Sequence, residues 1–224
     1  MNFDRLAPWY HGMECLLAGG LMQQSRTLFL PNTKNCRNAL LVGEGTGRFL
    51  VELLRSNSHL KITCVEKSEI MIRQIRQRLA RERLDSSRLE FKQMDVLDWT
   101  STTGKFDLVV THFFLDCFRA GQLERLVPLL AGSTAPEAIW LLADFQVPGH
   151  GLRRIRAQMI IAALYLFFRF STSLSANQLT PPDNFLRAAG FTLLGRRLKS
   201  LGLVHSDIWQ KYRPEQIGFR QPEK

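Results

Sequence analysis

The stretch 38-NALLVGEGTGRFL-50 decides the fold of this chain. An apolar run ends at Gly43, glycines recur at Gly45 and Gly47, and a pattern typical of a helix follows. Glycine lets the backbone take positive φ and lets a ligand approach main chain that a Cβ would block. The stretch therefore predicts a strand, a tight turn and a helix, with a cofactor bound at the turn.

The spacing of the glycines discriminates between cofactor motifs. A dinucleotide fingerprint reads G-x-G-x-x-G, but the sixth residue counted from Gly43 is Arg48, and no Gly-Lys-Ser/Thr of a phosphate loop follows. The observed G-x-G-x-G resembles class I S-adenosylmethionine (SAM) methyltransferases, which place the methionine part of SAM over this turn. A glycine-rich turn alone is common in α/β proteins, so further positions of the pattern are needed.

Length and composition predict one globular domain over residues 1–224, with 45% hydrophobic residues. The four cysteines form no C-x-x-C pair, so we expect neither a disulfide framework nor a metal site. No early apolar run follows Asp4, which argues against a signal peptide and favours a cytoplasmic protein.

The net charge of +10 is the unusual bulk property. The arginines within residues 73–83 alternate with apolar residues at helical spacing, which favours a solvated helix face. Arg153, Arg154 and Arg156 are less easily explained in this way. Nucleic acid and an anionic membrane are both partners that such charge suits, and peripheral contact with the inner face of a membrane is left open.

The end of each following strand carries a candidate cofactor residue. A second strand ends at Glu66, whose carboxylate can accept two hydrogen bonds from ribose hydroxyls, and Lys67 comes next. A third strand over residues 89–94 ends before Asp95 and Val96. The family resemblance implies that these two bind the adenine amino group and ring. Asp98 is expected to cap a short helix beginning near Trp99.

The resemblance extends over nearly the whole chain. Residues 106–110 predict a fourth strand ending at Thr111 and His112, residues 138–145 a fifth, and residues 191–210 a hairpin. The resemblance implies a three-layer, doubly wound α/β sheet of about seven strands in the order 3-2-1-4-5-7-6, with the last strand antiparallel. Thr111 and His112 would then face the sulfonium region of the cofactor.

Two segments outside the sheet are expected to cover the site. Residues 1–35 predict N-terminal helices, and their opening FDRLAPWY resembles the FDR-x-A-x-x-Y start of quinone-biosynthesis methyltransferases, except that His11 replaces an aspartate. The resemblance implies that Tyr10 contacts the cofactor; simple packing of Trp9, Tyr10 and His11 on the core is the alternative. Residues 152–189 predict a helical insertion over the substrate pocket. Its twelve uncharged residues 157–168 are too few for the roughly 20 of a membrane span.

One position departs from the family pattern. An acidic residue usually precedes the first glycine where this chain has Leu41, and Glu44 inside the turn is the only nearby acid. Glu44 either takes over part of the recognition of the SAM ammonium group or leaves it to backbone carbonyls and water. A hydroxyl acceptor would also need a base, for which His112 and Asp116 are the candidates, with Asp144 and His11 as weaker ones.

These observations predict a SAM-dependent methyltransferase that forms S-adenosylhomocysteine by O- or C-methylation of a small, lipophilic molecule. No appended nucleic-acid module is visible, and specific nucleic-acid binding is not expected. An RNA methyltransferase, supported by charge alone, and a SAM-binding protein without catalysis remain the alternatives.

Overall fold

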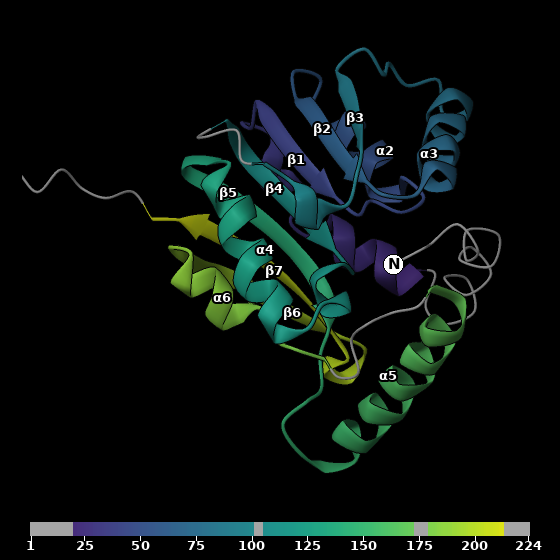
Figure 1. Cartoon of the computed structure of the whole chain (residues 1–224), viewed down its shortest axis with the longest axis vertical. Helices are drawn as coiled ribbons and strands as arrows, with labels where there is room; N and C mark the ends of the chain where they lie inside the picture. Colours follow the sequence, from purple (N-terminus) through teal and green to yellow (C-terminus); the bar gives the residue numbers. More distant parts are fainter. Residues whose placement is uncertain (1–19, 101–104, 173–178, 213–224) are drawn as a thin grey trace, which may run out of the picture.

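The computed structural model describes residues 20–100, 105–172 and 179–212. Seven strands form one sheet in the order β3-β2-β1-β4-β5-β7-β6 (Figure 1). The strand β7 runs antiparallel to both neighbours, and the other pairs are parallel. The predicted order is confirmed. The strands are β1 Asn38–Val42, β2 Lys61–Glu66, β3 Leu89–Gln93, β4 Phe106–His112, β5 Thr134–Phe145, β6 Phe191–Lys199 and β7 Val204–Lys211.

Helices cover both faces of the sheet (Figure 1). The α-helices are α2 Arg48–Ser56, α3 Glu69–Arg81, α4 Ala120–Gly132, α5 Gly151–Thr172 and α6 Asp183–Ala188, and residues 20–27 are also helical. The short 3-10 helices are η1 Leu30–Thr33, η2 Val96–Asp98, η3 Leu115–Cys117 and η4 Ser200–Gly202. Apolar residues of α2 and α3 form one core with the sheet, and those of α4 and α6 form a second core on the opposite face. The fold therefore has three layers.

The central strands form because both of their faces are covered. In β1, Ala39 and Leu41 belong to the α2 and α3 core, whereas Leu40 and Val42 belong to the α4 core. A strand buried on two sides reads as a continuous apolar run. Asp107 at the start of β4 fixes the neighbouring segment, since its two carboxylate oxygens accept hydrogen bonds from the amides of Arg37 and Asn38, each at 2.8 Å.

Two details of the predicted elements are wrong. The strand β5 begins at Thr134 and not at residue 138, because it continues through an irregularity at Glu137, which has φ of 61° opposite a register shift in β4. Asp98 does not cap a helix near Trp99. It lies inside η2, whose N-cap is Asp95, with the side chain accepting a hydrogen bond from Leu97 N.

A buried ion pair closes the hairpin of β6 and β7. The guanidinium of Arg196 donates through Nε to Asp207 Oδ1 at 2.8 Å and through NH2 to Oδ2 at 2.6 Å. Asp207 is fully buried, and Oδ2 also lies 3.0 Å from His205 Nδ1. Burial alone would raise the pKa of Asp207, but the hydrogen bonds from Arg196 and His205 lower it below its usual value. The carboxylate is therefore ionised and held inside the sheet.

The helix α5 follows the carboxyl end of β5 and extends away from the sheet (Figure 1). Its helical character was predicted. Among the described helices, none is long and apolar enough to cross a membrane.

Candidate functional site

The glycine turn lies between β1 and α2, at the carboxyl edge of the parallel strands. Gly43, Gly45 and Gly47 all have left-handed backbone conformations, with φ of 67°, 65° and 79°. A Cβ added to Gly43 would lie 2.1 Å from a carbon of the Phe114 ring, and one on Gly47 would lie 3.2 Å from Ile75. The backbone and the close packing both require glycine here.

The carboxylate of Glu44 accepts a hydrogen bond from the main chain at the start of α2. Its Oε1 accepts a hydrogen bond from Leu50 N at 2.8 Å, which satisfies one of the free amides of the first helical turn. Desolvation raises the pKa of Glu44 to about 7, although the main-chain amides and the charge of Arg26 act in the opposite direction. Glu44 thus has a structural partner, and its role in ammonium recognition stays a prediction.

Main-chain hydrogen bonds hold the ends of β2 and β3, which carry the candidate residues Glu66 and Asp95, beside the glycine turn. Gly43 N donates to Val65 O at 3.0 Å, and Met94 N donates to Glu66 O at 3.2 Å. The turn, Glu66 and the segment before Asp95 therefore lie side by side along one edge. Glu66 is buried, and its Oε1 accepts a hydrogen bond from Ser68 N at 2.9 Å.

Lys67 and Asp95 form an ion pair at this edge, with Nζ and Oδ2 at 2.8 Å. Asp95 Oδ1 accepts a hydrogen bond from Leu97 N at 3.1 Å. Partial burial would raise the pKa of Asp95, but the hydrogen bonds from Lys67 and Leu97 lower it overall. Val96, the first residue of η2, is buried. The predicted adenine-binding position is thus an ionised carboxylate with a cation beside it.

Thr111 and His112 point to opposite faces of β4. Thr111 is fully buried, and its Oγ1 accepts a hydrogen bond from Trp140 Nε1 at 2.8 Å. His112 packs edge-on against Phe49 of α2, with ring centroids 4.6 Å apart. Burial, and then the charge of Arg26, lower the pKa of His112 well below its usual value. His112 is therefore a neutral imidazole, whereas Thr111 serves the core.

A pair of buried carboxyls follows β4 and β5. Asp144 Oδ1 accepts a hydrogen bond from Phe114 N at 3.1 Å, and Asp116 in η3 lies close enough for the two charges to interact. Burial and then the charge of Asp116 raise the pKa of Asp144 well above its usual value. Burial also raises the pKa of Asp116, to about 6. Burial therefore favours the protonated form of Asp144 in the folded protein, whereas Asp116 is mostly ionised at neutral pH.

The protonated state of Asp144 predicts a pH-dependent stability. Since its pKa is higher in the folded state, the folded protein holds a proton that the unfolded chain releases, and the free energy of unfolding falls as pH rises above about 4. Asp144→Asn keeps a neutral side chain of the same shape. Its stability relative to wild type should therefore increase with pH. Glu44 is present in both proteins and largely cancels in this comparison, and the coupled Asp116 is counted together with Asp144.

Thermal unfolding of both proteins from about pH 4 to 8 measures this difference, on a scale of about 1.4 kcal/mol per pKa unit. The exposed Glu124→Gln on α4 is the matched control and should show no growing difference. A constant offset between Asp144→Asn and wild type at all pH values would show that Asp144 is ionised in the folded protein.

Several buried polar atoms near this edge are free to meet a ligand. Among the described residues, Gln23 Oε1, Ser25 Oγ, His112 Nδ1 and Asp144 Oδ2 are buried without a hydrogen-bond partner. Gln23 lies next to the start of α2, where its Nε2 donates to Arg48 O at 3.1 Å. Buried polar groups are normally paired, so unpaired ones at a binding edge fit the polar groups of a cofactor and its substrate.

The sequence did not single out two residues of this site. Arg26 is a buried cation whose guanidinium carbon lies 5.2 Å from the centre of the Phe113 ring and whose charge acts on Glu44 and His112. Phe114 covers Gly43, and no local pattern marks either role. The predicted contacts of Trp9, Tyr10 and His11 lie outside the described residues.

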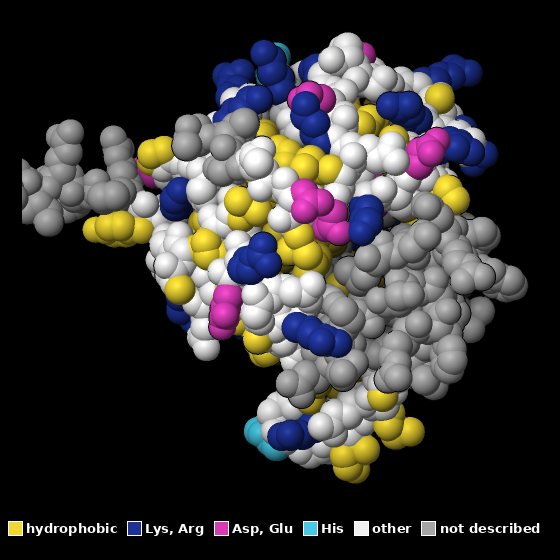
Figure 2. Space-filling model, viewed as in Figure 1, with side chains coloured by type: hydrophobic (Ala, Val, Ile, Leu, Met, Phe, Trp, Pro, Cys, Tyr) yellow, Lys and Arg dark blue, Asp and Glu magenta, His cyan; other side chains and the backbone are white. Residues whose placement is uncertain are grey.

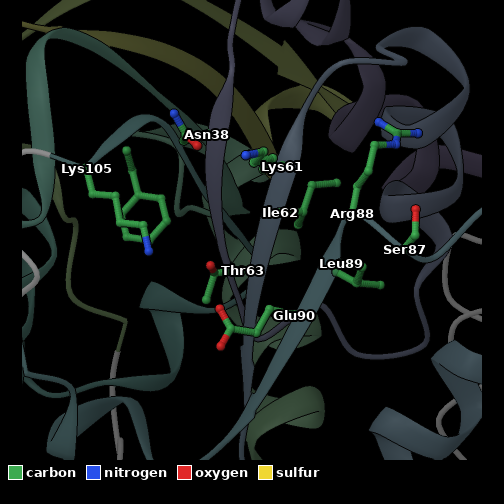
Figure 3. Close-up of a pocket in the computed structure, with 10 residues that line it drawn as sticks. Asn38, Lys61, Ile62, Thr63, Ser87, Arg88, Leu89, Glu90 and Lys105 are labelled. Carbon is green, nitrogen blue, oxygen red and sulfur yellow. The ribbon is translucent and has the colours of Figure 1, made fainter.

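A separate pocket of about 280 Å³ opens at the opposite edge of the sheet (Figure 3). It is lined by residues near the amino ends of β1, β2, β3 and β4, among them Asn38, Lys61, Glu90 and Lys105. Arg88 directs its guanidinium to the carbonyls of Asn57 and Leu60, at 3.0 and 3.1 Å. This pocket does not include the glycine turn. Within the described ranges, no group of three or more metal-ligating side chains could hold a metal ion.

An open, mostly parallel sheet with a glycine turn at its carboxyl edge is typical of the doubly wound α/β class, in which ligands bind at this edge. Residues 39–137 match the family model described as "Methyltransferase domain". This match covers less than half of the chain, and over these residues the sequence is similar to methyltransferase domains. A comparison with curated proteins finds no significant match.

Solved methyltransferase structures share the fold. An O-methyltransferase family protein from Burkholderia thailandensis aligns with a TM-score of 0.68 and 19% identity over 93% of this chain and 60% of its own. The N-methyltransferase NodS from Bradyrhizobium japonicum WM9 aligns with a TM-score of 0.60 and 16% identity, over 88% of this chain and 100% of its own. Human N-acetylserotonin methyltransferase in complex with SAM aligns with a TM-score of 0.59 and 15% identity, over 85% of this chain and 52% of its own. The chain thus spans little more than half the length of the first and third of these.

Proposed function

We propose that this protein transfers a methyl group from SAM to a small, lipophilic molecule by O- or C-methylation. The observation that carries the proposal is the alignment of three positions at one edge. Gly43 is bonded to the main chain of β2, and the end of β2 is bonded to the residue that precedes Asp95. This is the arrangement in which an extended nucleoside cofactor contacts a turn, a ribose acceptor and an adenine acceptor in sequence.

Each position has a distinct role toward the cofactor. The main chain of the glycine turn meets the methionine part, and the Glu66 carboxylate accepts hydrogen bonds from the ribose hydroxyls. Asp95 and the amide of Val96 bind the adenine, as the family resemblance implies. SAM supplies a methyl group on a positively charged sulfur, and the protein contributes positioning and the exclusion of water.

The surroundings of β4 and β5 support a lipophilic acceptor. The rings of Phe113, which directly follows β4, and Phe145, the last residue of β5, lie 5.2 Å apart. They pack in a cluster with Ala157 and Ile161 of α5 and with Leu21 of the N-terminal helical segment. An apolar lining with a few polar groups is typical of small-molecule sites. We propose that α5, as part of the insertion 152–189, covers this pocket.

Two groups can handle a proton of the acceptor. His112 is neutral, and its unpaired Nδ1 can accept a proton from a hydroxyl. Asp116 is mostly ionised at neutral pH and is the second candidate. Burial favours the protonated form of Asp144, and in that form its carboxyl donates a hydrogen bond to an acceptor oxygen and does not act as the base.

Calorimetric titration with SAM, S-adenosylhomocysteine and NAD tests the cofactor. We expect both SAM and S-adenosylhomocysteine to bind and NAD not to bind. Glu66→Ala should weaken S-adenosylhomocysteine binding by roughly 1–3 kcal/mol through lost hydrogen bonds to the ribose. Glu69→Ala, an exposed acid on the first turn of α3, is the matched control and should bind like wild type.

The outcomes separate the alternatives. Binding of NAD without binding of S-adenosylhomocysteine would exclude the cofactor assignment, and an unchanged affinity of Glu66→Ala would exclude Glu66 as the ribose acceptor. Binding of SAM without methyl transfer to any small acceptor would favour a SAM-binding protein without catalysis. Methyl transfer to RNA alone would favour the RNA methyltransferase.

A further inference from the structure

The helix α5 presents a second apolar face to solvent. Leu152, Ile155 and Met159 are 84%, 56% and 69% exposed, and they recur at the i, i+3, i+7 spacing that places them on one side of a helix. The side chains of Ala157 and Ile161 point the other way and pack on Leu203 and Val204. The exposed face is therefore not required to hold α5 against the sheet.

The turn η4 adds a further exposed leucine beside this face. Arg156 of α5 donates to Ser200 O at 3.2 Å and to Ser200 Oγ at 3.3 Å, which joins the two elements. Ser200 and Leu201 both have left-handed backbone, with φ of 50° and 58°, a conformation that is strained for a non-glycine residue. Leu201 is nevertheless 59% exposed. The strained turn thus keeps an apolar side chain in solvent.

Cations surround these apolar side chains. Arg153 and Arg154 are exposed on the first turn of α5, and Arg197 is exposed on β6. Apart from Asp183, the sequence has no acidic residue between Asp144 and Asp207, and Asp183 is paired with Arg196. Figure 2 shows hydrophobic side chains projecting at the lower end of the molecule, close to basic ones. This part of the surface therefore combines exposed apolar groups with a local excess of positive charge.

We infer that Leu152, Ile155, Met159 and Leu201, the α5–η4 surface, dock on the surface of an anionic lipid bilayer. The apolar side chains enter the boundary between headgroups and acyl chains, and the arginines meet the lipid phosphates. The inference is independent of the proposed methyl transfer. If the protein both docks on a bilayer and transfers methyl groups, α5 contacts the bilayer with its outer face and lines the proposed lipophilic pocket with its inner face.

Charge distinguishes this partner from two others. In a symmetric dimer the same patch meets itself, which would place the arginines of one copy against those of the other. Nucleic acid would satisfy the arginines but would leave Leu152, Ile155 and Met159 in water. An anionic bilayer satisfies the charge and the apolar side chains together.

Vesicle flotation tests the α5–η4 surface on the full chain. We expect wild type to float with phosphatidylcholine vesicles that contain phosphatidylglycerol at low salt, and not with phosphatidylcholine alone. Ile155→Glu with Met159→Glu removes the apolar contact, and Arg153→Glu with Arg154→Glu reverses the charge. Each pair should lower the bound fraction about tenfold or more. Arg81→Glu with Arg125→Glu makes the same change in charge on exposed positions of α3 and α4, and should float like wild type.

The controls make every outcome decisive. Circular dichroism and S-adenosylhomocysteine titration verify that each variant is folded, since none of the changed residues lies at the glycine turn. Failure of wild type to float with anionic vesicles, or an equal loss in the Arg81 and Arg125 control, overturns the inference. If sedimentation velocity shows a wild-type dimer that Ile155→Glu with Met159→Glu dissociates, while flotation is unchanged, the face is an interface between copies and not a membrane surface.

Discussion

Replacing Arg196 with alanine should lower the free energy of unfolding by about 3–5 kcal/mol, because it leaves the carboxylate of Asp207 buried without its cation. Asp207 is fully buried, and both of its oxygens accept hydrogen bonds from Arg196. His205 and Trp209 Nε1, which lie 3.0 and 3.3 Å from Asp207 Oδ2, cannot replace two charge-assisted bonds. Urea unfolding followed by circular dichroism measures the change.

The neighbouring Arg197→Ala is the matched control for this variant. Arg197 is exposed, and within the part of the chain that the structure describes its guanidinium donates only to Arg196 O at 3.4 Å. Its loss should change stability by about 0.5 kcal/mol or less. Equal effects of the two variants would mean that the buried ion pair does not hold the hairpin. Arg196→Lys should recover part of the loss, since lysine keeps the charge but not the two parallel bonds.

Replacing His112 with alanine should reduce turnover of a hydroxyl acceptor by roughly 10²-fold or more while leaving S-adenosylhomocysteine affinity nearly unchanged. The reason is that a buried, neutral imidazole with an unpaired Nδ1 is available to accept the acceptor's proton. Release of S-adenosylhomocysteine, measured against a panel of small phenols and other hydroxyl compounds, reports turnover. The exposed His59→Ala is the matched control.

A second measurement on His112 needs no acceptor. Because burial lowers its pKa, the Cε1 proton resonance of His112 should stay at its neutral position as the pH falls through about 6. A normal titration would contradict the neutral assignment. Turnover that survives in His112→Ala would exclude His112 from the chemistry and point to an acceptor that is already ionised.

The parts of the fold that the sequence predicted are those specified by local chemistry. The glycine turn sets the start of α2 at Arg48, so the predicted order of strand, turn and helix is found in the structure. The strands β1, β2 and β4 lie between two covered faces and read as apolar runs. The strand order followed from the family resemblance, not from any property of single strands.

The parts that the sequence did not predict depend on contacts between distant segments. The predicted fifth strand begins at residue 138, yet pairing of Thr134 with Phe106 of β4 extends β5 back across the irregularity at Glu137. The raised pKa of Asp144 depends on Asp116 and Asp207, which belong to other elements. Arg26 becomes part of the site only when the N-terminal helical segment packs against Phe113. Such effects follow from tertiary packing.

The position of β7 has a consequence for synthesis on the ribosome. The strand β7 is the last of the sheet in sequence, but it lies between β5 and β6, and β6 pairs with no other described strand. Until residues 204–211 leave the exit tunnel, β6 has no partner, one side of β5 is open, and Arg196 lacks Asp207. The nascent chain therefore adds β6 and β7 to the sheet in a single late event. Until then, the open edge of β5 is available to chaperones.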